Sequence, residues 1–291
     1  MNSKHFASAV AAAALLTGVA NAQINVTGLP TVDVNGDITT DTTWTRDNVY
    51  NLNGVQVFVR DGAVLTIEAG TVIASADGGS IAVTRGSQIF ADGDKSNPII
   101  FTSDNDVATW TDGTPASGTW RATAQEWGNL TIMGNAYISE NNGPVATGPV
   151  PSGSNQATME GLDGFAPLNI YGGDQDDDDS GTLNYVSLRY GGEVVSLANE
   201  LNGMSIGGVG RETDIDFVEI MNNVDDGIEI WGGTVNVKHF SIWNIGDDSV
   251  DLDQGYRGKM QYGLVVQGYS VDANPGSGVG DRGFEIDGSE A

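Results

Sequence analysis

The residues best placed to do chemistry in this sequence are aspartates that recur at a fixed spacing. Asp225-Asp226 and Asp247-Asp248 each precede a short apolar run, and 22 positions separate the two pairs. Carboxylates held side by side ligate hard cations such as Ca²⁺. They also serve as general acid and base in glycoside hydrolysis. The pattern therefore indicates two kinds of chemistry, cation binding and glycan cleavage.

An internal repeat determines how these aspartates are positioned. Residues 217–233 read FVEIMNNVDDGIEIWGG, residues 239–255 read HFSIWNIGDDSVDLDQG, and the frame resumes as DRGFEIDG at residues 281–288. A unit this short cannot bury its own apolar face, so successive copies must stack as a solenoid. Asn222 and Asn244 are equivalent, and we expect their amides to form a ladder.

The earlier chain continues the pattern with a less regular period. Alternating apolar segments occur at residues 62–73, 81–93, 97–103, 127–139 and 181–192, closed by Gly or Asn-Pro turns. The fold class we predict is all-β, a right-handed, single-stranded parallel β-helix of about 22 residues per coil. Most of residues 31–288 resembles bacterial secreted and surface proteins with pectin-lyase-like β-helix repeats. That resemblance implies the fold and export, and it implies no particular activity.

Strand alternation assigns the acidic residues to columns on the outside of the solenoid. If Ile228, Val250 and Phe284 point inward, their neighbours point outward. The outward metal-ligand candidates are Glu229, Asp251 and Glu285 in one column, Asp253 and Asp287 in the next, and Asp225 and Asp247 in the preceding turn. Like charges at strand spacing repel, and Ca²⁺ would relieve the repulsion. Hydration and capping of turn amides by Asp are the structural alternative.

A second acidic segment lies in an insertion. The run from Asp174 to Asp179 offers Asp176 and Asp178 as further calcium ligands. It lacks the spacing and the closing Glu of an EF-hand. The argument for calcium there depends on charge density alone.

Glycan hydrolysis is the sharper hypothesis for the repeat aspartates. Asp226, Asp247 and Asp248 resemble the aspartates of polygalacturonases, and that resemblance implies one proton donor with the others activating water. The sequence departs from that family in two places. Residues 266–269 stand where the family has Gly-His-Gly, and Arg257-Gly258-Lys259 follows Asp248 too closely to be its Arg-Ile-Lys motif.

A calcium-dependent polysaccharide lyase is the other enzymatic alternative. It needs a basic side chain beside the metal to remove a proton next to a uronate carboxyl. Lys238, Arg257, Lys259 and Arg282 lie near the acidic residues in sequence. They serve equally well as surface residues that balance charge.

Aromatic side chains offer a glycan-binding surface. Trp231 and Trp243 fall on outward positions of adjacent coils, and Tyr256 lies in a turn. Apolar ring faces stack on sugars while neighbouring carboxylates accept hydroxyl protons. We expect these three residues to contact an extracellular glycan, unless loops cover them.

Composition and the N-terminus indicate export. Lys4, an apolar stretch and Ala20-Asn21-Ala22 form a signal peptide over residues 1–22, cleaved after Ala22, which leaves residues 23–291 as the β-helix domain. We expect a secreted or cell-surface protein, with the periplasm as an alternative. The apolar stretch is too short to span a membrane, and no later segment is long enough. The chain has no cysteine, so stability must come from a large core or from metal ions.

Charge narrows the choice of partner. The net charge is -27, and removing Lys4 leaves 11 basic against 39 acidic residues, or -28. Nucleic acid and anionic membrane surfaces are therefore poor partners, and we expect the chain to bind no nucleic acid. Insertions near residues 104–126 and 140–180 leave the repeat and are natural places for binding. The sequence stops after the strand-like FEID, so we expect either a truncated chain or a partner there, including end-to-end self-association.

These observations favour a non-catalytic exported β-helix scaffold, adhesin-like, that binds calcium and contacts a glycan or an envelope component. The alternative is a polysaccharide-degrading enzyme, a glycoside hydrolase or calcium-dependent lyase, using the Asp226/Asp247/Asp248 face. The missing catalytic partners favour the scaffold, as does the expectation that the carboxylates follow the repeat. A concentrated cluster of carboxylates would favour the enzyme.

Overall fold

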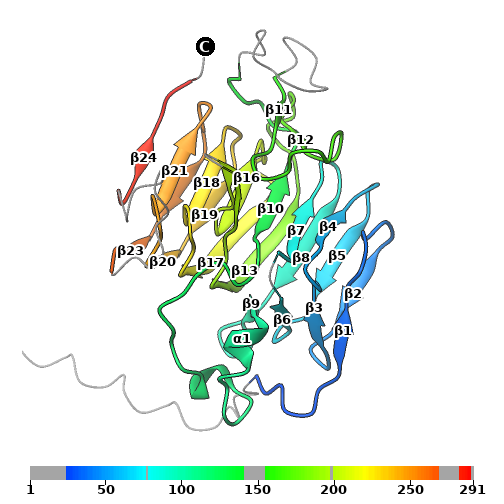
Figure 1. Cartoon of the computed structure of the whole chain (residues 1–291). Helices are drawn as coiled ribbons and strands as arrows, with labels where there is room; N and C mark the ends of the chain where they lie inside the picture. The colour runs from blue at the N-terminus through cyan, green and yellow to red at the C-terminus, as the bar shows by residue number, and fades with distance from the viewer. Residues whose placement is uncertain (1–23, 77, 141–154, 197–198, 269–281, 290–291) are drawn as a thin grey trace, which may run out of the picture.

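The chain folds as a parallel β-helix, which confirms the predicted fold class (Figure 1). The computed structural model describes residues 24–76, 78–140, 155–196, 199–268 and 282–289. The predicted signal peptide lies outside these residues. Among the described residues, no helix has the length and apolar character needed to cross a bilayer.

Three faces enclose the core. The first face is a seven-stranded parallel sheet made of β4 (Gln56–Val59), β7 (Ser80–Val83), β10 (Leu130–Met133), β16 (Met204–Gly207), β18 (Ile228–Trp231), β21 (Val250–Asp253) and β24 (Glu285–Ile286). The other two faces form one 13-stranded sheet, because two long strands, β13 (Gly181–Arg189) and β17 (Asp214–Met221), run through the corner between them.

Each half of β13 and β17 pairs within one of these two faces. The second face contains their C-terminal halves together with β1 (Thr31–Asp33), β3 (Val49–Asn51), β6 (Val72–Ser75), β9 (Ile99–Ser103), β20 (Ser241–Trp243) and β23 (Leu264–Val266). The third contains their N-terminal halves together with β2 (Thr42–Trp44), β5 (Val64–Ile67), β8 (Gln88–Asp92), β19 (Asn236–Lys238) and β22 (Lys259–Gln261).

The remaining elements lie in segments that leave the coils. Two antiparallel pairs are formed by β11 (Ala157–Thr158) with β12 (Ile170–Tyr171), and by β14 (Val194–Ser196) with β15 (Asn199–Glu200). Residues 104–126 carry the one-turn helix α1 (Asp104–Val107) and the 3₁₀ helix η1 (Pro115–Ser117). Arg121 and Glu126 anchor this segment by an ion pair, and Ser103 donates to Glu126 Oε2 over 2.6 Å.

The observed register agrees with the repeat read from the sequence. Val250 pairs with Ile228 and Ile242 with Ile220, so the spacing of 22 holds on two faces. Asn244 Nδ2 donates to Asn222 Oδ1 over 3.2 Å, which confirms the predicted amide ladder. The earlier coils are less regular: β1 and β3 pair at an offset of 18 residues, whereas insertions lengthen the offset to 49 between β7 and β10 and to 74 between β10 and β16.

Stacked aliphatic side chains fill the interior. In the seven-stranded sheet, one inward column is fully buried and consists of Ile81, Leu130, Met204, Ile228 and Val250. Burial of each such side chain contributes about 1.5–3 kcal/mol relative to exposure. The expectation that Phe284 joins the buried interior is wrong, because Phe284 is 49% exposed. Ile286 is 69% exposed because β24 has a paired strand on one side only.

A stack of aromatic rings that we did not predict follows one corner of the helix. Tyr185, Phe217, His239 and Tyr262 stack in that order, with ring centroids 4.4, 4.4 and 4.9 Å apart. All four have positive φ, between 47° and 62°, where bulky side chains are rarely found. His239 Nδ1 also lies 2.7 Å from Asp216 Oδ1. Ring stacking at the strand repeat stabilises this corner against its backbone cost.

We predict that Phe217→Asn destabilises the protein by about 1–2 kcal/mol although Phe217 is 37% exposed. Phe217 has an aromatic ring on each side. Because Asn tolerates positive φ, the stability lost in Phe217→Asn comes from the lost stacking and not from backbone strain. Urea denaturation measures the change. Tyr262→Asn is the matched control, since Tyr262 ends the stack and loses one neighbour. If Phe217→Asn lowers the free energy of unfolding by no more than Tyr262→Asn does, stacking does not stabilise this corner.

Candidate cation site

Two equivalent turns bring the repeat aspartates together. One turn joins β17 to β18 and carries Asp225 and Asp226, and the next joins β20 to β21 and carries Asp247 and Asp248. Val224 and Ile245 are buried and fix the turns to the core. Gly227 allows the coils to approach, because a Cβ there would lie 2.5 Å from Ser249 O.

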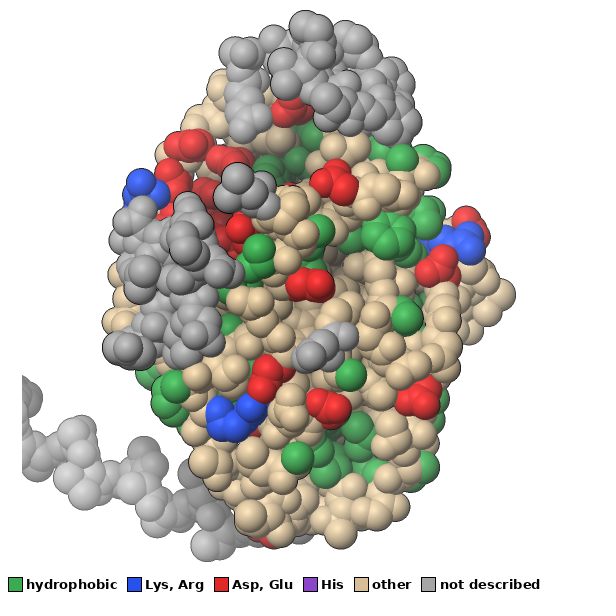
Figure 2. All heavy atoms as spheres, in the orientation of Figure 1, with side chains coloured by type: hydrophobic (Ala, Val, Ile, Leu, Met, Phe, Trp, Pro, Cys, Tyr) green, Lys and Arg blue, Asp and Glu red, His purple; other side chains and the backbone are tan. Residues whose placement is uncertain are grey.

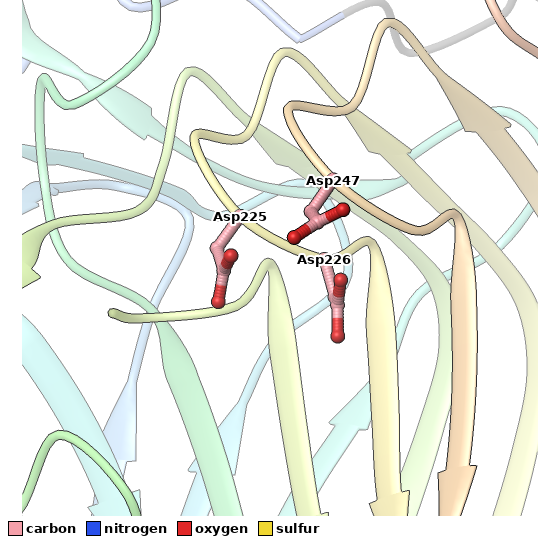
Figure 3. A group of neighbouring side chains, drawn as sticks. All are labelled: Asp225, Asp226 and Asp247. Carbon is pink, nitrogen blue, oxygen red and sulfur yellow. The ribbon is translucent and has the colours of Figure 1, made fainter. Parts of the chain in front are cut away.

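Figure 3 shows the carboxylates of Asp225, Asp226 and Asp247 converging from the two adjacent coils. One oxygen from each lies within 4.8 Å of the others. A second group with the same spacing contains Asp226, Glu229 and Asp251. We call these five residues the acidic cluster. Oxygens coordinated to one Ca²⁺ at about 2.3–2.6 Å lie at most about 5 Å apart, so each group fits a cation.

The two strand residues of the cluster occupy a column whose chemistry changes along the helix axis. Glu229 pairs with Asp251, which pairs with Glu285, as the sequence predicts. The column begins with apolar side chains, continues with hydroxyls and ends with carboxylates. Its residues, in order, are Phe58, Ala82, Thr131, Ser205, Glu229, Asp251 and Glu285. The carboxylates therefore gather toward the coils of β18, β21 and β24.

Asn202, the residue equivalent to Asp226 on the preceding coil, organises the buried part of the cluster. Asn202 Oδ1 accepts a hydrogen bond from the backbone N–H of Asp226 over 3.1 Å, and its Nδ2 donates to Glu229 Oε2 over 2.5 Å. Asp226 Oδ1 accepts from the backbone N–H of Asp248 over 2.9 Å. These contacts hold Asp226 and Glu229 in place without supplying a positive charge.

Two glutamates that sequence reasoning missed reach the cluster from the insertions. Glu160 follows β11, and Glu200 belongs to β15. Both interact electrostatically with Asp225. Burial raises the pKa of Glu160 to about 7, and it also raises the pKa of Glu200. No sequence signal places these residues, because the repeat does not fix the register of an insertion.

Burial among like charges raises the pKa values of the cluster itself. Burial, reinforced by Glu160, Glu200 and Asp247, raises the pKa of Asp225 to about 8. The pKa values of Asp226 and Glu229 lie well above the ordinary values, first because of burial and then because of neighbouring carboxylates. Burial and Asp253 raise the pKa of Asp251 to about 6. Without a cation, the cluster therefore holds protons near neutral pH.

The five residues of the acidic cluster follow the repeat, and Glu160 and Glu200 from the insertions add two further carboxylates beside them. In Figure 2, Asp and Glu side chains concentrate in the upper left of the molecule, where β21 and β24 lie in Figure 1. The insertions that carry Glu160 and Glu200 also cover part of the outer face of the sheet. That cover is apolar beside the cluster, where Met159, Leu162 and Tyr171 pack against Met133 and Trp231.

The other acidic residues predicted for this face lie at its edge; they are the catalytic candidate Asp248 and the metal-ligand candidates Asp253, Glu285 and Asp287. Asp248 is 3% exposed and its Oδ2 is 3.3 Å from Arg282 Nη1, which also contacts Glu285 Oε2 at 2.5 Å. Asp253 pairs with Trp231 in register, and the backbone N–H of Asp287 donates to Leu252 O. None of these four acidic residues belongs to the two cation-sized groups found among the described residues.

Protein groups contact both predicted calcium ligands of the acidic insertion, Asp176 and Asp178. Asp176 forms two 2.6 Å contacts with the Arg257 guanidinium, which lowers its pKa. Asp178 is buried and accepts hydrogen bonds from the backbone and side chain of Asn135 and from Ser180 Oγ. Both carboxylates thus fasten the insertion to the coils, and neither belongs to the cation-sized groups found among the described residues.

The predicted aromatic platform is also corrected. Trp231 points out of the coil, as expected, but is only 7% exposed because Tyr171 and the β11–β12 segment cover it. The Tyr256 hydroxyl donates to Val235 O over 2.7 Å, and its ring packs on the main core. Trp243, at 37% exposure, is the most exposed member of the predicted set.

The basic residues considered for a lyase do not surround the acidic cluster. Arg257 is held by Asp176, while Lys238 and Lys259 lie on β19 and β22 of the 13-stranded sheet. Arg282 approaches the edge of the cluster through Asp248.

Comparison with known proteins supports the fold and does not identify a chemistry. A family model described as a pectate-lyase-like β-helix domain matches residues 36–290. No curated protein matches the chain. No solved structure matches it either.

We predict that the metal-free protein loses stability as the pH rises from about 4 to 8. Folding raises the pKa of Asp225 to about 8, that of Glu160 to about 7 and that of Asp251 to about 6, so the folded state binds more protons than the unfolded state in this window. The free energy of unfolding then falls by about 1.4 kcal/mol per pH unit for each extra proton. Urea denaturation in chelator at pH 5, 6, 7 and 8 measures the slope.

The control for this prediction is Asp225→Asn, which removes one of the titrating groups and should flatten the slope. Asp176 acts in the opposite direction, because its lowered pKa contributes stability that is lost below about pH 4. Stability that stays constant or rises between pH 5 and 8 would contradict the proton binding inferred for the cluster.

Proposed function

The chain belongs to the pectate-lyase-like β-helix family, and on that premise we propose that it is an exported, non-catalytic scaffold that binds calcium through its acidic cluster. The observation that carries this proposal is the placement of five carboxylates in two cation-sized groups. Burial of like charges is costly unless a counter-charge is present. A divalent cation supplies that charge.

The ligand set favours calcium over other metals. Both groups consist only of carboxylates, and hard oxygen ligands suit Ca²⁺, Mg²⁺ or Mn²⁺ rather than zinc or copper. Asp225 and Asp247 come from turns and are partly exposed, which leaves room for water or backbone oxygens. Calcium accepts such mixed and flexible coordination, whereas Mg²⁺ demands a near-ideal octahedron.

Export and a scaffold role fit the remaining features. The N-terminal 22 residues have the features of a signal peptide, and the rest of the chain has no cysteine and 11 basic against 39 acidic residues. A long core and bound calcium would then replace disulfides outside the cell. In this proposal the protein is secreted or held at the cell surface, contacts an envelope component or a glycan, and offers Trp243 as an exposed ring for the glycan.

We predict that calcium raises the melting temperature relative to chelator. Calcium at 100 times its dissociation constant adds about 2.7 kcal/mol, and about 2–4 °C accompanies each kcal/mol in a domain of this size. The shift should be larger at pH 8 than at pH 5, because protons compete for the same oxygens. Differential scanning calorimetry of the mature chain, with calcium and with chelator, measures the shift in melting temperature at pH 5 and at pH 8.

Asp225→Asn should reduce this shift, and Asp214→Asn is the matched control. Asp214 is exposed at the start of β17, and the residue paired with it on the next coil is already an asparagine, Asn236. Identical melting curves in calcium and in chelator at pH 8 would refute the proposal.

A polysaccharide-degrading enzyme is the second candidate, and the gathering of Glu160 and Glu200 over the repeat aspartates favours it. A carboxyl with a pKa of about 7, such as that of Glu160, can donate a proton to a leaving oxygen at neutral pH. Asp226 and Asp247 lie in one group, but Asp248 lies outside it beside Arg282. The three aspartates implied by the polygalacturonase resemblance therefore do not form one group.

Release of new reducing ends from polygalacturonate, alginate and neutral glycans distinguishes the two candidates. The scaffold proposal predicts no turnover, with calcium or with chelator. Turnover that disappears in Glu160→Gln and in Asp247→Asn, while Asp214→Asn retains it, would overturn the scaffold and establish the enzyme.

A further inference from the structure

Asp226 belongs to both cation-sized groups. It shares one with Asp225 and Asp247, which lie in the turns, and the other with Glu229 and Asp251, which lie on β18 and β21. Each group combines two residues from the first coil with one from the second. The repeat thus places two sets of ligands side by side, with Asp226 between them.

A second observation points to ligands in these groups. Asp226 is 7% exposed and Glu229 is 6% exposed, and neither forms an ion pair within the described part of the chain. Each uses one oxygen for a hydrogen bond, to the backbone N–H of Asp248 and to Asn202 respectively. Asp251 Oδ1 is buried and has no hydrogen-bond partner. Buried oxygens in this state are available to a positive charge.

We propose that two divalent cations bind in tandem and share Asp226 as a bridging ligand, an inference that rests on the proposed function. The first cation uses Asp225, Asp226 and Asp247, and the second uses Asp226, Glu229 and Asp251. A carboxylate has two oxygens, so Asp226 can give one to each cation. The five carboxylates carry five negative charges against four positive charges, which removes most of the repulsion inside the cluster.

The two sites differ in access to solvent. The first is built from the turns, and Asp225 and Asp247 are partly exposed, so its cation keeps bound water and exchanges readily. The second contains the buried Glu229, fixed by Asn202, so its cation exchanges slowly. Each cation links the same two successive coils, one through the turns and one through the paired strands β18 and β21. Together they clamp these coils along the helix axis.

The test is the number of calcium ions bound per chain. The mature protein is stripped with chelator, dialysed against calcium at pH 8 and analysed by mass spectrometry of bound metal, with protein measured by amino-acid analysis. We expect two ions in the unchanged protein and in Asp214→Asn. We expect one in Asp225→Asn, one in Glu229→Gln and none in the double variant Asp225→Asn/Glu229→Gln. Asp226→Asn should lower the number below that of either single variant.

The outcomes separate this inference from the proposed function. One ion in the unchanged protein, lost in Asp225→Asn or in Glu229→Gln, would overturn the tandem arrangement and leave calcium binding intact. No ion would overturn both. Two ions that remain in Asp225→Asn and in Glu229→Gln would also overturn the tandem assignment. Circular dichroism confirms that each variant is folded, and the two single variants test the arrangement even where Asp226→Asn fails to fold.

Discussion

Alignment of equivalent residues on successive coils is the constraint on which this molecule depends. Strand pairing fixes neighbouring coils about 4.8 Å apart, so whatever a position carries is repeated beside itself. For Ile228 and Val250, the repetition builds a dry core. For Phe217 and His239, it builds a ring stack that holds a corner at positive φ. For Glu229 and Asp251, the same register brings like charges together, which costs free energy and calls for a counter-charge.

The repeat made the fold and part of the site predictable from sequence. The spacing of 22 between Asp225 and Asp247 follows the coil, so their proximity could be derived without a structure, as could the ladder of Asn222 and Asn244. The insertions could not be treated in this way, because their register depends on tertiary contacts. Trp231 was therefore expected at the surface and lies under Tyr171, and the contribution of Glu160 was missed.

Charge density alone does not show which carboxylates lack a basic partner. The run from Asp174 to Asp179 is the densest acidic stretch of the sequence, yet Asp176 is neutralised by Arg257 and Asp178 caps Asn135 and Ser180. The acidic cluster is sparser in sequence, and what distinguishes it is the absence of a basic partner for Asp226 and Glu229 among the described residues. A carboxylate that is paired with an arginine has its charge balanced and serves to hold the structure together. A buried carboxylate without such a partner needs a proton or a metal ion to balance its charge.

If the chain is exported, as we propose, its environment decides whether the acidic cluster holds protons or a metal ion. Inside the cell, where free calcium is scarce, the cluster would fold with protons on Asp225 and its neighbours, whose raised pKa values allow this near neutral pH. Outside, calcium would displace those protons and link the coils of β18 and β21. A scaffold without cysteine would then gain its stability after export, from an ion rather than from a disulfide. The same exchange would deprive Asp226 of the proton that a hydrolytic acid requires, so full calcium occupancy and general-acid catalysis by Asp226 exclude one another.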